Sequence, residues 1–111
     1  MKLGNKERLV LLKILEKIEV LEMATDGTID DFLHDKLKQH AAGMAFLNMG
    51  ELTNHLSQEF KTANKDIPFH RMKGMRNVVA HEYDVLDFAK IWRTIKEDIP
   101  VLKIKITELI D

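Results

Sequence analysis

The sequence predicts an all-α fold, a bundle of about four main helices, on three observations. Apolar residues recur at spacings of three and four along most of the chain, as they do on one face of a helix. No segment alternates apolar and polar residues with the β-branched enrichment of strands, and no Asn-Gly pair marks a hairpin turn. The chain contains no internal repeat or low-complexity tract, so we expect residues 1–111 to form a single helical domain.

The first helix is expected from Asn5 to about Ala24. Gly27 suits the left-handed position that follows a helix end, and Thr28 or Asp30 can cap a short helical turn over residues 29–33. The buried stripe of the first helix consists of Leu11, Ile14, Ile18 and Leu21.

A long helix is expected next, from about Asp35 to Lys61. Gly43 and Gly50 lie inside it, where each costs roughly 1 kcal/mol relative to alanine. The simplest explanation is close approach of another helix at points where a side chain would clash. The predicted apolar stripe is Leu37, Ala41, Met44, Ala45, Leu52, Leu56 and Phe60, and a second line widens it with Phe46, Met49 and Thr53.

Two further helical segments complete the chain. After a polar break at 64–66, Pro68 fits the first turn of a helix that lasts to about His81, with Phe69, Met72, Met75 and Val79 as its stripe. The last segment, over about residues 88–109, is regularly apolar at spacings of three and four. Pro100 lies within this segment and should kink or briefly break the helix.

Composition excludes several classes of protein. The absence of cysteine rules out a disulfide scaffold, a thiolate metal site and a cysteine nucleophile. No apolar run reaches eighteen residues, so we expect no membrane span and a cytoplasmic protein. Four histidines show no metal-ligand spacing, and we therefore expect no metal site and no cofactor; these are His34, His40, His55 and His70.

Charge is unevenly distributed along the chain. The whole chain sums to −1, but residues 61–76 contain five basic side chains and one acidic side chain. That segment carries a net charge of +4 and the remainder −5. A basic segment of this kind suits a phosphate-bearing partner, although an ordinary solvated helix face is an alternative explanation. Among its residues, Arg71 and Lys73 are the candidate RNA-binding side chains.

One cluster concentrates chemically active side chains between Arg76 and Tyr83. Asn77 and His81 lie one helical turn apart, so the amide could orient the imidazole. Histidine can take and give a proton near neutral pH, and arginine matches phosphate oxygens. Arg76 and His81 lie about 140° apart around a helix axis, so a two-fold dimer is one way to bring both into one groove. Solubility and helix-dipole compensation remain an alternative explanation.

At these residues the sequence resembles the HepT-like toxins of the HEPN superfamily. The family signature is arginine, four residues, histidine, one residue and tyrosine, which corresponds here to Arg76, His81 and Tyr83. Similarity extends over about residues 5–110 and includes Met49-Gly50-Glu51, Ile67-Pro68-Phe69, Ile91-Trp92 and Asp98-Ile99-Pro100.

The resemblance implies a dimeric helical protein with a composite cleft and a metal-independent endoribonuclease activity. It implies that His81 acts in proton transfer, that Arg76 holds the scissile phosphate and that Asn77 supports them. It further implies a toxin–antitoxin pair, in which a nucleotidyltransferase antitoxin adds AMP to Tyr83. Glu51 is assigned a structural or site-supporting role. The alternative is a non-catalytic helical module that docks a nucleotidyltransferase and positions its substrate.

Overall fold

The computed structural model describes residues 3–111, and in that part of the chain every regular element is a helix. This confirms the predicted all-α class. The elements in order are α1 (Asn5–Ala24), α2 (Ile29–Leu33), α3 (Lys36–Thr53), α4 (Gln58–Ala63), α5 (Phe69–Glu82), the 3₁₀ turn η1 (Tyr83–Val85), α6 (Phe88–Glu97) and α7 (Ile99–Ile110).

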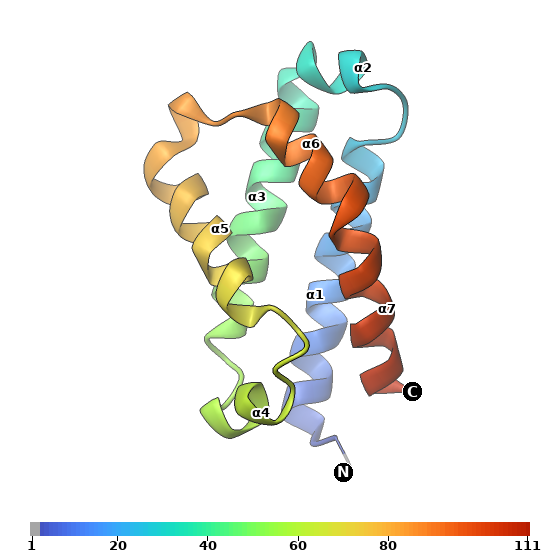
Figure 1. Ribbon diagram of the computed structural model, residues 1–111, viewed down its shortest axis with the longest axis vertical. Coiled ribbons are helices and arrows are strands. Elements are labelled where there is room, and N and C mark those ends of the chain that lie inside the picture. Colours follow the sequence, from blue (N-terminus) through green and yellow to red (C-terminus); the bar gives the residue numbers. More distant parts are fainter. Residues whose placement is uncertain (1–2) are drawn as a thin grey trace.

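Helix α3 is the centre of the arrangement, because it packs against α1 on one side and against α5 on the other. Figure 1 shows α6 leading into α7, which runs back beside α1, so that both ends of the chain lie at the same end of an elongated bundle. The core consists of apolar side chains from all the longer helices, and α2 joins it through the buried ring of Phe32, which contacts Phe88 and Trp92 of α6. Within the described residues, no helix is long and apolar enough to cross a membrane.

The connection between α1 and α2 has the predicted form. The buried Thr25 hydroxyl donates to the Leu21 carbonyl at 2.9 Å, and Gly27 has a φ of 117°. Thr28 and Asp31 then form a capping box at the start of α2. Hydrogen bonding from the Thr28 backbone, followed by its side chain, lowers the pKa of the Asp31 carboxyl.

The prediction of one helix over 35–61 is wrong, because the segment is two helices joined by a short turn. Asp35 caps α3 as its N-cap, but α3 ends at Thr53 and α4 begins only at Gln58. The Ser57 hydroxyl accepts a hydrogen bond from the Phe60 N–H and so starts a new helix. Leu56 is buried in the turn itself, which is why the apolar spacing continues through the break.

The predicted stripe of this segment is also partly wrong. Leu37 is 81 % exposed and Met44 is 58 % exposed, so neither belongs to the core face of α3. The line expected only to widen the stripe is the buried one, because α3 is covered on two sides. Its members are Phe46, Met49 and Thr53, which are buried together with Ala42, Gly43, Ala45 and Gly50.

The C-terminal half follows the predictions closely. Pro68 is the N-cap of α5. The buried face of that helix consists of Phe69, Met72 and Val79, which lie against the core. Asp98 separates α6 from α7, with Pro100 in the first turn of α7, where its missing N–H is not required.

Candidate active site

Helix α5 carries three of the four residues predicted for the Arg76–Tyr83 cluster, and the burial of its apolar face fixes the direction in which they point. Because Met72 and Val79 face the core, Asn77 and His81 are left exposed while Arg76 lies half-buried beside α3. Tyr83 falls just outside the helix, in η1.

Arg76 is held on both edges of its guanidinium group. Its Nε donates to the Glu51 carboxylate of α3, and its Nη1 donates to the Asn77 side-chain oxygen at 3.2 Å. Gly50 makes this approach possible, since a methyl group there would overlap the Cβ of Arg76 and lie 2.9 Å from the Met72 carbonyl oxygen. The side-chain stem of Arg76 therefore occupies the space that a larger residue at Gly50 would fill.

Like Arg76, Tyr83 contacts α3, and the sequence did not indicate this second contact. Its hydroxyl hydrogen-bonds to Nδ1 of His40, and the two rings lie with centroids 5.1 Å apart. Phe88 packs edge-on against the same ring at 5.9 Å. A Cβ at Gly43 would lie 2.9 Å from Tyr83 Cε2, so this glycine also admits a close neighbour. Burial raises the pKa of the Tyr83 hydroxyl above 10.0, and the nearby Asp84 carboxylate adds to the effect.

The prediction of close approach at both glycines is thus confirmed, and the two contacts lie on one helix. Gly43 accommodates Tyr83, and Gly50 accommodates Arg76. Helix α3 therefore positions both Arg76 and Tyr83.

His81 differs from Arg76 and Tyr83, which are both partly buried, because it is exposed. The oxygen of Asn77, which the spacing predicts to orient the imidazole, accepts from Arg76 instead. Arg76 and His81 project from α5 about 140° apart. A single copy of the chain consequently presents one arginine that is already positioned and one solvent-facing imidazole on a different side of the helix.

The two candidate RNA-binding residues lie on different sides of α5. Arg71 pairs with Asp98 at 3.3 Å, at the junction of α6 and α7. Lys73 lines a pocket on the other side, together with residues of α4. The basic segment over 61–76 is therefore divided by the helix into separate surfaces.

Sequence reasoning did not identify His40 as a site residue, and it gave no partner for Glu51. His40 lies 43 residues from Tyr83, and Glu51 lies 25 residues from Arg76, so no local spacing connects either pair. The available signal was Gly43, one turn after His40, since a helical glycine indicates where something must approach. No group of three or more possible metal ligands occurs among residues 3–111.

Comparison with known proteins identifies the class of protein to which the chain belongs. A family model described as "Ribonuclease HepT-like" matches residues 14–109. A protein of Thermococcus cleftensis named "Probable ribonuclease HepT" is 37% identical over 110 residues, which cover 98% of each chain. A "putative RNase" of Methanocaldococcus jannaschii is 30% identical over 94 residues, or 84% of this chain and 86% of the relative.

Another "putative RNase", from Caldanaerobacter subterraneus, is 30% identical over 98 residues, covering 87% of this chain and 88% of the relative. No solved structure matches the chain significantly. The all-helical architecture is that of the HEPN superfamily, which the sequence resemblance indicated. Within that superfamily, the chain belongs to the ribonuclease HepT-like family.

Proposed function

We propose that this chain is a metal-independent endoribonuclease, the toxin of a cytoplasmic toxin–antitoxin pair, with Arg76 and His81 as its catalytic residues. The observation that carries the proposal is that Arg76 of α5 is held by Glu51 and Asn77, while His81 of the same helix α5 is exposed. The ribonuclease HepT-like family supports the reaction class, since it matches nearly the whole chain.

The chemistry requires little beyond these two side chains. RNA supplies its own nucleophile, the 2′-hydroxyl, and an imidazole removes its proton as the oxygen attacks the neighbouring phosphorus. The bond from phosphorus to the 5′-oxygen then breaks, and that oxygen receives a proton from an imidazolium. A guanidinium group held in place stabilises the charge that develops on the phosphate oxygens. Arg76 fits the task of stabilising this charge because its orientation is already set before substrate arrives.

A homodimer completes the site in this proposal. The angle of about 140° between Arg76 and His81 suits a groove in which the arginine of one copy faces the histidine of a second copy. Large apolar side chains lie exposed on α3 and on the α5–η1 segment, and covering them would favour such an interface. These are Leu37, Met44, Val78 and Val85.

Tyr83 is the proposed acceptor of AMP from a nucleotidyltransferase antitoxin. Transfer joins the tyrosine oxygen to the α-phosphate of ATP, and pyrophosphate leaves while the hydroxyl loses its proton. The product would place an added negative charge and considerable bulk near Arg76. Both effects would exclude RNA from the cleft.

The decisive experiment compares RNA cleavage by the unaltered protein, His81→Ala and the matched control His55→Ala, all in the presence of a chelator. His55 is exposed and lies in the turn after α3, so its replacement should leave cleavage unchanged. We expect His81→Ala to lose cleavage while circular dichroism and oligomeric state stay the same. Cleavage that persists in His81→Ala, or that stops with the chelator, would sink the proposal.

A different result would identify the alternative function. A stable complex with a nucleotidyltransferase, and no cleavage of any RNA by the unaltered protein, would indicate a non-catalytic docking module.

A further inference from the structure

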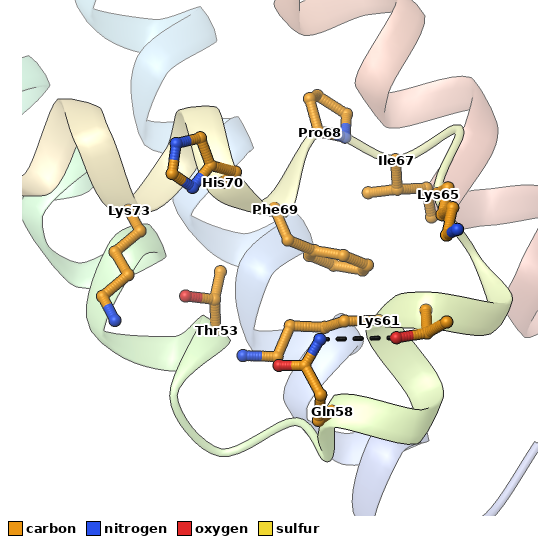
Figure 2. A pocket seen from close by; sticks show the side chains of 10 residues that line it. Thr53, Gln58, Lys61, Lys65, Ile67, Pro68, Phe69, His70 and Lys73 are labelled. Atoms are coloured by element: carbon orange, nitrogen blue, oxygen red, sulfur yellow. Dashed lines mark hydrogen bonds between the residues drawn. The ribbon is translucent and has the colours of Figure 1, made fainter.

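A pocket of about 390 Å³ opens between the end of α3, helix α4 and the start of α5. Four of its lining side chains are lysine or histidine: Lys61, Lys65, His70 and Lys73. Thr53 and Gln58 add polar groups, and none of the lining residues is acidic. In Figure 2, Lys61 and Lys73 extend from opposite walls towards Thr53, and Lys65 lies on the connection between α4 and α5.

The lysines of this pocket are free to bind an anion. Within residues 3–111, none of the three belongs to an ion pair, whereas Arg71, Arg76 and Lys103 each pair with a carboxylate. The first turn of α5 also contributes to the wall, and Pro68 leaves it without a side-chain cap. A concave surface lined by unpaired cations raises the local concentration of anions such as phosphate.

The remaining wall of the pocket is apolar. Ile67, Pro68 and Phe69 line it, and Figure 2 shows the Phe69 ring between Pro68 and the stem of Lys61. The Phe69 ring packs on Phe60 with centroids 6.0 Å apart and is buried, as is Ile67, so Pro68 is the part of this wall that a ligand can touch. A ligand with both an anionic and a flat apolar part fits such a lining, and the volume lies in the range of pockets for small ligands.

The pocket is aligned with the candidate active site along two helices. Lys73 precedes Arg76 by about one turn of α5, and Thr53 follows Gly50 by about one turn of α3. Because Arg76 packs on Gly50, the pocket and the braced guanidinium group lie on the same α3–α5 seam. A strand that places one phosphate at Arg76 can therefore pass directly to the lysines.

We propose that this pocket binds a nucleotide of single-stranded RNA next to the one that is cleaved, its phosphate on the lysines and its base against the half-buried Pro68. This subsite rests on the proposed function of the chain as a ribonuclease. An unpaired base can turn into such a recess, whereas a base in a duplex is held in its stack. The pocket is concave and large enough for a nucleotide, which favours RNA over the flat acidic surface of a partner protein as its ligand.

Binding of a short fluorescently labelled single-stranded RNA tests the proposal without relying on cleavage. Measured by anisotropy in the His81→Ala background, Lys61→Gln with Lys73→Gln should weaken binding roughly tenfold at low salt. The slope of log affinity against log salt should become shallower by about 0.7 for each phosphate that no longer meets a lysine. Neither lysine belongs to an ion pair within residues 3–111, so the thermal midpoint should be unchanged.

The matched control is Lys13→Gln with Lys17→Gln. These two lysines line another pocket of about 390 Å³, but Glu16 lies in its lining and balances part of their charge. We expect the control to bind RNA as the parent does.

Each outcome separates the subsite from the proposed function. Equal reductions of RNA affinity in both double variants, no reduction in the pocket variant, or no RNA binding by the parent would overturn the subsite. If the subsite fails while the His81-containing protein still cleaves RNA, the proposed function stands. If the pocket variant binds RNA more weakly but the chain with His81 never cleaves RNA, the subsite stands and the proposed function fails.

Discussion

In its N-terminal half, α5 presents His70 and Lys73 to a pocket without acidic residues, whereas in its C-terminal half Arg76 meets a carboxylate of α3. Tyr83, just beyond the end of the helix, likewise meets His40 of α3. Apart from Arg71, which pairs with Asp98, and the exposed His81, the two halves thus differ in whether their polar groups already have partners. Unpaired cations suit the capture of a mobile polyanion, and braced groups suit a reaction in which orientation matters.

Helix α3 has a different role beside each half of α5. Near Thr53 it only borders a pocket, but at Gly43 and Gly50 it touches the side chains that the resemblance assigns to chemistry. Substitutions in α3 should therefore affect the side chains in the C-terminal half of α5 far more than those in its N-terminal half.

The largest effect is expected from Gly50→Ala. The new methyl group would overlap Arg76 Cβ and crowd the Met72 backbone carbonyl, neither of which can rotate away. Overpacking of this kind costs about 1–3 kcal/mol and outweighs the gain of roughly 1 kcal/mol in helix propensity. Urea denaturation should show a lower free energy of unfolding, and cleavage should fall as Arg76 is displaced.

Gly74→Ala is the matched control, because Gly74 lies in α5 with no atom near the position of an added Cβ. There the helix propensity acts alone, and the free energy of unfolding should rise by up to about 1 kcal/mol. A Gly50→Ala protein as stable as Gly74→Ala would show that α3 and α5 do not meet as closely as described.

A smaller effect on stability, but a clear one on activity, is expected from Glu51→Gln. The Arg76–Glu51 pair is partly exposed, with 32% and 43% of the two side chains accessible, so its removal should cost less than about 1 kcal/mol. The guanidinium group would lose its charged partner and its fixed orientation. We expect kcat/KM for RNA to fall roughly tenfold or more, mainly through kcat.

Asp98→Asn serves as the control for Glu51→Gln, since it breaks the more exposed Arg71–Asp98 pair on the other side of α5. Cleavage by this variant should match the parent. Equal kinetics for Glu51→Gln and the parent would mean that bracing of Arg76 contributes nothing to the reaction.

The smallest effect concerns the titration of Tyr83, which is the only tyrosine in the chain. Because burial raises its pKa in the folded state, tyrosinate absorbance should appear with a midpoint above pH 10.0. Its contribution to stability is complete below the unfolded-state pKa of about 10 and is lost as pH rises through the higher folded-state pKa. A midpoint at or below 10.0 would contradict the described burial of the ring. Tyr83→Phe should abolish the signal.

Local patterns in the sequence are sufficient for most of the helices, because caps and apolar spacing act within a few residues. Thr28, Pro68 and Pro100 mark boundaries by their own chemistry, and the structure has boundaries at all three. The break after Thr53 escapes prediction because Leu56 is buried as if the helix continued, while the decisive hydrogen bond is the one that the Ser57 hydroxyl accepts from the Phe60 N–H.

The site was predictable only as far as one helix extends. Arg76, Asn77 and His81 are neighbours on α5, so their grouping follows from spacing alone. Glu51, which pairs with Arg76, and His40, which bonds to Tyr83, come from another helix, and the side on which each residue lies depends on how α5 packs. Glu51 and His40 could therefore be assigned only once α3 and α5 were seen together.

Gly43 and Gly50 are seven residues apart on α3, close to two full turns, which corresponds to about 10.5 Å along the helix axis. Since Tyr83 rests at the first glycine and Arg76 at the second, the rise of a continuous helix sets the spacing between them. Fraying at the end of α5, or a change in the length of the segment leading to α6, leaves that spacing intact. A one-residue insertion in α3 between the two glycines would rotate one contact away from the other, even though it touches neither Arg76 nor Tyr83.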